Sequence, residues 1–317
     1  MGREVVEKAA DPFIAGIYAG KPEKLSIKSA FPRLYELEKD YGSLLVGALF
    51  AKSEKTDDNL PRSFTFRRGA QTLTAKLAEN LGADVQTNSE VLRIGKRTDG
   101  KFTIKTSGGE TVFDAVILAS TAEVCAKVLE DADLSAKLRE IYYPPVAMIF
   151  FGVKDENLAQ KPDGFGFLIP SSENRKILGT LFNSAVFAKR APDEFQLLTT
   201  FVGGARNAKL FDKSDEELFE IVFTELNEIL GIKQKPDFQH IKRWQKAIPQ
   251  YEIGYDKLET AIENFEQKTP GAFFCSNFYR GISVGDCVKN AYETAENVEN
   301  FLKNSHPQIN TDEHKFI

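Results

Sequence analysis

A glycine-punctuated segment near the end of the chain, residues 271–287, constrains the fold more than any other feature. Its apolar residues 272–275 predict a short buried strand, and Gly281 and Gly285 predict a turn. An amphipathic helix is expected to begin near Asp286. Its apolar positions recur at alternating spacings of three and four residues: Val288, Ala291, Ala295, Val298 and Leu302. The N-terminus of a helix has unpaired N–H groups and a positive dipole end, which favour negative charge. The start of this helix is therefore either an ordinary one, capped by Asp286, or a binding site for a negatively charged ligand.

Composition limits the classes of protein that fit. With 317 residues the chain is long enough for a large core in two intermixed lobes. A net charge of −5 and a pI near 5.5 argue against a nucleic-acid partner, which would need a clustered basic face. Only His240, His306 and His314 are present. A histidine-rich metal site or a Ser–His triad is therefore not expected, and a cofactor enzyme suits this scarcity.

The cysteines and the apolar runs of the sequence indicate where in the cell the protein is expected. Cys125, Cys275 and Cys287 are too few and too scattered for a disulfide framework, so reduced thiols and a cytoplasmic location are expected. The charged N-terminus predicts no signal peptide. The longest apolar runs, residues 44–50 and 144–153, are shorter than the roughly 20 residues that a membrane-spanning helix needs.

The first third of the chain has mainly helical periodicity. Residues 1–15 predict a helix, and residues 27–52 predict a helical stripe interrupted at Gly42. Residues 63–66 predict a strand. A further helix is expected to run through Leu73, Leu77 and Leu81 and to end at Gly82.

Strands dominate the middle of the chain. Short strands are predicted at Val85 and at residues 91–94, 102–104 and 115–119, with hairpin turns at Asp99-Gly100 and Gly108-Gly109. Longer apolar strands are predicted at residues 146–153, 177–182 and 197–203. A helix over 215–230 with Ser214 as its N-cap follows. This second pattern is typical of an α+β lobe, and its many phenylalanines suit either a core or an apolar slot for a flat ligand.

Four separated segments occur in the order found in protoporphyrinogen oxidases, the FAD enzymes late in haem synthesis. They are residues 12–20 with 25–27 and 31–32, residues 164–173, residues 244–251, and residues 271–287. The chain resembles this family, which belongs to the flavin amine oxidase superfamily, over residues 1–304.

The resemblance implies a mixed α/β and α+β fold. A partial FAD-binding domain of the Rossmann-like, glutathione-reductase type would be interleaved with an α+β substrate-binding domain. The expected parts are a remnant of a helical lobe (1–16), two parts of the substrate domain (17–62 and 136–268), two parts of the FAD domain (63–135 and 269–304) and a polar tail (305–317).

The G-x-G-x-x-G turn that holds the FAD pyrophosphate in this family is absent from the sequence. We therefore expect the N-terminal third of a complete member to be encoded separately or lost, or the start of the chain to be assigned too late. A separate N-terminal fragment or a homo-oligomer is a candidate partner, and FAD binding by this polypeptide alone is left open.

The resemblance also implies site residues. Phe165, Leu168 and Phe201 match positions that line the substrate cavity, and Gly16 matches a glycine whose backbone carbonyl is thought to help take up a proton. The positions that match flavin contacts are Val91, Trp244, Ile282, Ser283 and Val284. Ser276 replaces a common glycine and is expected to crowd the flavin. Three arginines are either partners of the substrate propionates or plain surface residues: Arg62, Arg206 and Arg280.

The implied activity is FAD-dependent oxidation of protoporphyrinogen IX or coproporphyrinogen III to the porphyrin, with dioxygen or another electron acceptor. The expected location is cytoplasmic, with peripheral contact at the inner membrane as the alternative. Two rival readings remain. One is another flavin amine oxidase-like enzyme, such as an amine oxidase or a carotenoid desaturase. The other is a non-catalytic remnant or one half of a split enzyme.

Overall fold

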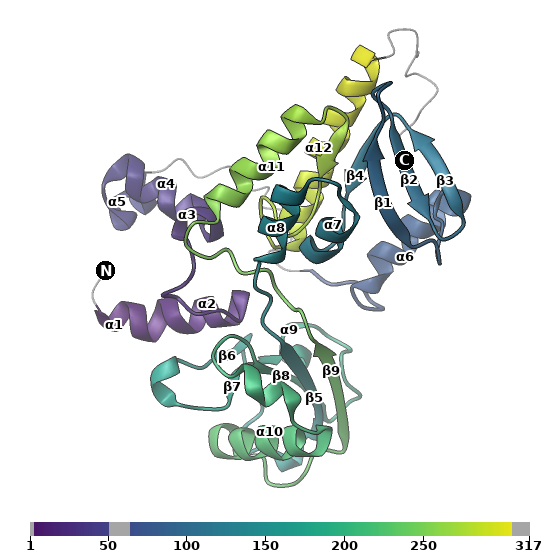
Figure 1. Cartoon of the computed structure of the whole chain (residues 1–317). Helices are drawn as coiled ribbons and strands as arrows, with labels where there is room; N and C mark the ends of the chain where they lie inside the picture. Colours follow the sequence, from purple (N-terminus) through teal and green to yellow (C-terminus); the bar gives the residue numbers. More distant parts are fainter. Residues whose placement is uncertain (1–2, 51–63, 306–317) are drawn as a thin grey trace. The chain divides into compact units, whose positions relative to one another are not determined.

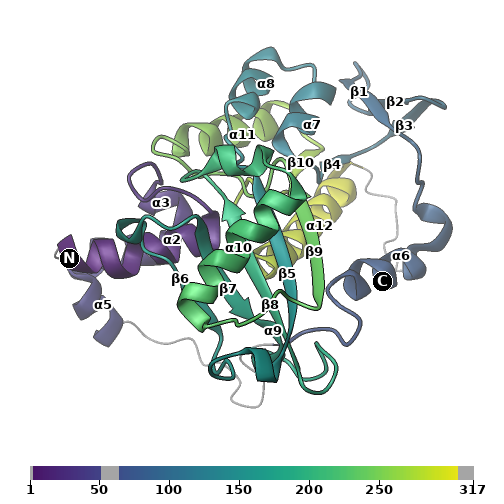
Figure 2. The same ribbon diagram turned by 90° about the horizontal axis from the view of Figure 1, so that it is seen from below.

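A computed structural model describes residues 3–50 and 64–305 of the protein. The chain forms two compact units, each built from separated stretches of sequence. Unit 1 combines Met1–Leu25 with Tyr142–Ile253, and unit 2 combines Ser26–Ile141 with Gly254–Ile317. Each unit is described by itself (Figures 1 and 2). The interleaving means that neither unit is a continuous domain of the sequence.

Unit 1 is organised around a five-stranded antiparallel sheet in the order β6-β7-β8-β5-β9. Its strands are β5 (Val146–Lys154), β6 (Gly166–Leu168), β7 (Ile177–Phe182), β8 (Phe195–Gly203) and β9 (Phe238–Trp244). Strand β5 lies between β8 and β9, and in the register its Val146 is opposite Gly203 on one side and Trp244 on the other. Phe, Ile, Leu, Val and Thr predominate in β5, β7 and β8, where they suit a pleated, buried surface, whereas β9 is more polar.

Helix α10 (Asp215–Leu230) covers one face of this sheet (Figure 1). Its N-terminus carries a capping box in which Ser214 and Glu217 each satisfy the other's backbone N–H. The core between helix and sheet includes Ile149 and Leu198 from the strands and Leu218 from the helix, all fully buried. Because side chains alternate along a strand, the neighbouring residues project from the opposite face, where they are available for a site.

The N-terminal helices of unit 1 pack beside strands β6 and β7 of the sheet. The elements α1 (Arg3–Val5), η1 (Val6–Ala10) and α2 (Asp11–Tyr18) follow one another without a break, and α2 contacts β6 and β7. The remaining short elements are η3 (Asp155–Asn157), η4 (Ser171–Glu173), α9 (Asn183–Val186) and η5 (Ala208–Asp212).

Unit 2 contains two small sheets. An antiparallel meander joins β1 (Val91–Lys96), β2 (Phe102–Thr106) and β3 (Gly109–Phe113), and a parallel pair joins β4 (Val116–Leu118) to β10 (Ala272–Phe274). Its helices are α3 (Ile27–Ala30), α4 (Pro32–Tyr41), α5 (Leu44–Phe50), α6 (Gln71–Leu81), η2 (Gly82–Asp84), α7 (Ala122–Val128), α8 (Ala132–Arg139), α11 (Asp256–Lys268) and α12 (Val284–Ser305). Phe102, Val116 and Ala272 form a buried cluster between the two sheets.

Several local predictions are confirmed. The helix over 215–230 and the strand over 177–182 have the predicted bounds, and Ser214 is the N-cap. The helical stripe of residues 27–52 is interrupted at Gly42, a left-handed residue that ends α4. Both predicted hairpin turns connect neighbouring strands of the β1–β3 meander. These elements carry strong local signals, either periodic side chains or glycine turns.

Two local predictions are wrong. Val85 and residues 64–66 lie in no strand, because no neighbouring segment pairs with them; Ser63 lies outside the described residues. The last helix begins at Val284, close to its predicted start near Asp286. Within its predicted stripe Ala295, Val298 and Leu302 are half-buried, whereas Val288 is 45% exposed, and Thr294 outside the stripe is buried.

The contact units also divide the chain differently from the predicted domain boundaries. They change after Leu25, Ile141 and Ile253. Residues up to Leu25 stay with unit 1 because Leu25 bridges to Glu252. Helix α11 joins unit 2 because it contacts α8 and β10. Of the predicted polar tail 305–317, all but the first residue lies outside the described residues.

Candidate functional site

An apolar cavity of about 530 Å³ lies in unit 1, on the sheet face that α10 leaves uncovered. Val146 and Met148 of β5 form part of its floor, since they alternate with the residues that face α10. Phe201 of β8 and Leu181 of β7 extend the floor across the sheet. The volume falls in the range of small-molecule sites, and the lining is aliphatic and aromatic apart from Thr180.

Helix α2 closes one side of the cavity with small residues. Ala15, Gly16 and Ala19 line it. A Cβ atom added at Gly16 would lie 2.6 Å from Cδ2 of Leu168, a distance that no real contact tolerates. Glycine therefore allows α2 to pass directly against Leu168, and the space beside them stays open. The helix also ends two residues later, so Gly16 belongs to the last turn, where carbonyl groups lack helical partners.

Large apolar side chains surround the opening and remain exposed. Phe165 is 62% exposed, Leu168 41% and Trp244 47%. Trp244 is the last residue of β9, and Ala247 and Ile248, which follow it, continue the wall. Exposed apolar side chains gathered around one cavity are typical of a ligand or partner site rather than of random surface.

A buried ion pair holds α2 in place over the sheet. Asp11, at the start of α2, lies 2.7 Å from the Arg206 guanidinium, and both side chains are almost completely buried. Arg206 also donates to the carbonyls of Asp11 and Ile169, while Asp11 accepts from the N–H of Ser171. Arg206 was expected to be either a propionate partner or a plain surface residue. It is neither, because its guanidinium group is buried and joins Asp11 to Ile169. We call this ion pair the Asp11–Arg206 clamp. Arg280 is exposed and stacks on its neighbour Tyr279, and Arg62 lies outside the described residues.

Unit 2 has a second, more polar cavity of about 450 Å³. It lies where the parallel strands β4 and β10 both end, which is the edge of an α/β sheet where ligands bind. The residues that line it are Ala119, Ser120, Thr121, Cys275, Ser276, Asn277, Cys287 and Asn290. This donor set fits the polar part of a cofactor. The hydroxyl of Ser276 lies 2.7 Å from the carbonyl oxygen of Ser120, so it is held by the protein.

The start of α12 has the shape that the glycine-rich segment predicts. Ser283 and Asp286 cap the helix reciprocally: the Asp286 N–H donates to Ser283 Oγ, and Ser283 donates to the Asp286 carboxylate. Gly281 has a φ of +127°, and a Cβ there would meet the Asp286 side chain at 2.6 Å, so only glycine fits. Val284, the first helical residue, is 71% exposed.

The predicted site residues fall into two groups. Five of them line the unit 1 cavity: Gly16, Phe165, Leu168, Phe201 and Trp244. Val91 begins β1 in unit 2, and Ile282, Ser283 and Val284 lie at the start of α12 in the same unit. Sequence reasoning missed Met148 and Leu178. Both lie in predicted strands, but only the strand register reveals which alternate residues face the cavity.

Other site types find no support among the described residues. No group of three or more His, Cys, Asp or Glu residues is arranged to hold a metal ion there. No described helix combines the length and the apolar character that a membrane span requires. The three cysteines are free thiols, and burial raises the pKa of Cys125 to about 11.

The chain belongs to the flavin containing amine oxidoreductase family, whose model matches residues 1–299. Within that class, it is 36% identical to the mitochondrial protoporphyrinogen oxidase of Nicotiana tabacum, over 95% of this chain and 66% of that protein. It is 25% identical to the coproporphyrinogen III oxidase of Bacillus subtilis, over 91% of this chain and 63% of that protein. The chain thus spans slightly less than two thirds of the length of these relatives.

Solved structures have the same fold. A candidate protoporphyrinogen oxidase from Exiguobacterium sp. 255-15 is 26% identical and superposes with a TM-score of 0.77, over 94% of this chain and 64% of that one. A reduced UDP-galactopyranose mutase superposes with a TM-score of 0.66 at 14% identity, over 98% of this chain and 67% of that one. The second likeness concerns the fold alone. The mixed α/β and α+β architecture of this oxidoreductase family is therefore confirmed.

Proposed function

We propose that this chain takes part in the FAD-dependent oxidation of a porphyrinogen, protoporphyrinogen IX or coproporphyrinogen III, to the porphyrin in haem biosynthesis. The observation that carries the proposal is the unit 1 cavity. Five residues chosen from three separate sequence segments and from β8 line one apolar space. The family assignment and the named relatives support the same substrate class.

The cavity suits a broad tetrapyrrole ring. Aliphatic floor residues and the rings of Phe165, Phe201 and Trp244 offer apolar and aromatic surface to the two faces and the edge of a macrocycle. The cavity would hold part of the ring and exclude water from it. The small residues of α2 leave the room that a flat ligand needs, and the Asp11–Arg206 clamp keeps that helix from drifting.

The loss of a proton from the substrate would be assisted by a backbone hydrogen-bond acceptor rather than by an ionisable side chain. No residue that lines the unit 1 cavity is ionisable. The carbonyl of Gly16 lies in the last turn of α2, where it is free to accept a hydrogen bond from a pyrrole N–H as that group becomes acidic. Gly16 would therefore orient the substrate by accepting a hydrogen bond from its pyrrole N–H, and the proton that leaves the nitrogen would pass to water at the opening of the cavity.

FAD, when bound, supplies the hydride acceptor for this reaction. Trp244 in unit 1 and Val91, Ile282, Ser283 and Val284 in unit 2 are the proposed contacts. The exposed first turn of α12 would stabilise negative charge through its dipole and through the N–H groups that the cap formed by Ser283 and Asp286 does not use. The polar side chains of the unit 2 cavity would hold the more hydrophilic parts of the cofactor.

The electron acceptor would be dioxygen or another oxidant. A cytoplasmic location, with peripheral contact at the inner membrane as the alternative, is part of the same proposal. So is assembly with a separate N-terminal fragment or with a second copy, which would complete the binding of the FAD pyrophosphate.

The test is a direct assay of the purified protein with added FAD. We expect porphyrin fluorescence to rise faster than in a protein-free control with protoporphyrinogen, coproporphyrinogen or both, and the protein to show flavin absorbance. Binding of the porphyrin product is followed separately through the fluorescence of Trp244, the single tryptophan. A protein that takes up no FAD and binds no porphyrin would refute the proposal and favour a non-catalytic remnant.

A further inference from the structure

The unit 1 cavity leaves one feature of the proposed substrate without a partner. Tetrapyrroles of this class carry carboxylate side chains, whereas every residue that lines the cavity is uncharged. An ionised carboxylate is not buried against apolar surface unless a cation or several hydrogen bonds accompany it. The carboxylates must therefore project from the cavity, and a cation beside the opening would determine which way the ring enters.

Lys242 is placed beside that opening. It lies two residues before Trp244 on β9, so both side chains project from the same face of the sheet. In the strand register it is opposite Met148, which lines the cavity floor. Its Nζ atom lies 4.9 Å from the centre of the Trp244 ring. The lysine is exposed to solvent, and its ammonium group lies over a ring that lines the cavity.

The charge of Lys242 is available for a ligand. Contact with an aromatic face holds an ammonium group in position without neutralising it. Within residues 3–50 and 64–305, Lys242 has no ion pair. Its neighbour Arg243 is different: it projects from the opposite face and is held by Asp215 and by the carbonyl oxygen of Lys213. Arg243 is therefore a structural residue on one face of the sheet, whereas Lys242, on the other face, can pair with a ligand.

We propose that Lys242 binds a carboxylate of the tetrapyrrole at the mouth of the unit 1 cavity and so determines the orientation of the ring. This inference rests on the proposed function. The ammonium would pair with the carboxylate while the apolar ring contacts Trp244 and the floor. Trp244 then contacts both groups, since Lys242 Nζ lies over its ring and the residue also lines the cavity.

The experiment compares a charged probe with a neutral one. Binding of a porphyrin dicarboxylate and of its dimethyl ester is measured by quenching of Trp244 fluorescence and, independently, by porphyrin anisotropy. The variants are Lys242→Gln, Lys242→Arg and a matched control, Lys209→Gln. Lys209 is exposed on η5, whose neighbours Leu210 and Phe211 pack with α10 on the other side of the sheet.

We expect Lys242→Gln to weaken binding of the dicarboxylate by about tenfold and to leave binding of the ester unchanged. Lys242→Arg should retain binding, Lys209→Gln should match the wild type, and the wild-type preference for the acid should shrink as salt is added. If Lys242→Gln binds the acid as tightly as the wild type does, or weakens acid and ester equally, the role of Lys242 is refuted while the proposed function stands. If the wild type binds neither probe, the proposed function fails with it.

Discussion

At the scale of single residues, the cavity depends on the absence of side chains as much as on their presence. Gly16 and Leu168 come from distant segments, and the contact between them exists because one of them has no Cβ. The rings of Phe165 and Trp244 then remain as exposed apolar surface around the opening. Position 16 is therefore the most direct place to change the volume of the cavity without changing its chemistry.

We predict that Gly16→Ala weakens porphyrin binding by roughly fivefold or more, because Leu168 must move into the cavity to avoid the new methyl group. The free energy of unfolding should change by less than about 1 kcal/mol, since alanine favours the helix by a similar amount. Fluorescence quenching of Trp244 and urea unfolding measure the two effects. The control is Gly108→Ala, where the nearest non-neighbouring atom lies 3.8 Å from the added Cβ. Unchanged affinity in Gly16→Ala would show that the space beside α2 is not used.

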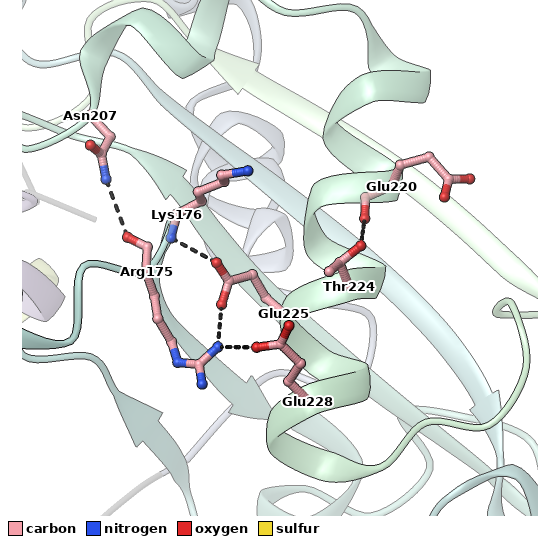
Figure 3. A network of polar contacts seen from close by, with 7 residues as sticks. All are labelled: Arg175, Lys176, Asn207, Glu220, Thr224, Glu225 and Glu228. Carbon is pink, nitrogen blue, oxygen red and sulfur yellow. Dashed lines mark hydrogen bonds and ion pairs between the residues drawn. The ribbon is translucent and has the colours of Figure 1, made fainter.

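At the scale of elements, a polar network joins the start of β7 to α10 (Figure 3). Glu225 of α10 is buried and accepts hydrogen bonds from the Lys176 N–H at 2.9 Å and from Arg175 at 2.8 Å. Arg175 also reaches Glu228, one helical turn further on, and its carbonyl accepts a weaker bond from Asn207. Glu225 thus positions the strand that forms part of the cavity floor.

We predict that Glu225→Ala lowers the free energy of unfolding by about 2–3 kcal/mol, because it leaves the Lys176 N–H without its acceptor and removes a charged hydrogen bond. Glu228→Ala is the matched control. That carboxylate is 57% exposed in its pair with Arg175, and its loss should have little effect. Chemical denaturation measures both variants. Equal destabilisation by the two substitutions would contradict the assignment of the anchoring role to Glu225.

A second element-scale prediction concerns Glu266 of α11 and strand β10. Burial raises the pKa of Glu266, and the hydrogen bond from the Phe274 N–H opposes that rise. The folded state therefore binds the proton more tightly than the unfolded state does. The resulting loss of stability is absent below the unfolded pKa and complete above the folded one, so stability falls as pH rises between them.

Glu266→Gln removes this titration and keeps an acceptor for the Phe274 N–H. We predict that the stability of the variant relative to the wild type increases as pH rises from about 4 to about 7. Urea unfolding at several pH values gives the difference directly. A difference that stays constant with pH would mean that Glu266 titrates alike in the folded and unfolded chain.

At the scale of the whole molecule, each unit has its own buried cluster, although each is assembled from two stretches of chain. Ile149 and Leu198 belong to the cluster of unit 1, and Phe102 and Val116 to that of unit 2. The chain passes between the units after Leu25, Ile141 and Ile253. The two clusters have no residue in common, so a substitution beside one cluster is expected to leave the stability of the other unchanged.

We predict that the effects of Glu225→Ala and Glu266→Gln add within about 0.5 kcal/mol in the double variant. Hydrogen exchange should show the loss of protection from Glu225→Ala confined to residues of unit 1. The wild type and the two single variants are the controls. Strong non-additivity, or protection lost equally in both units, would mean that the two clusters unfold as one.

The sequence by itself determined the elements whose signals are local. The capping box at Ser214, the periodic stripe of α10 and the glycine hairpins depend on neighbours within a few residues, so they could be predicted. The same holds for the family. Gly16, Phe165, Leu168 and Phe201, which were assigned to the substrate side, lie with Trp244, which was assigned to the flavin, around one cavity, and their roles stay predictions. The strands predicted at Val85 and residues 64–66 failed because a strand needs a partner that no local pattern reveals.

Only the tertiary structure decided the rest. The Asp11–Arg206 clamp joins residues far apart in the chain, and a local pattern gave no reason to bury either charge. Strand register places Met148 in the cavity floor, and it places Lys242 beside the opening of the cavity. The exposure of Val288 in the predicted stripe of α12 and the burial of Thr294 outside it were likewise not predictable from periodicity. Periodicity reports which residues share a face, whereas the partner that covers the face is a property of the packed molecule.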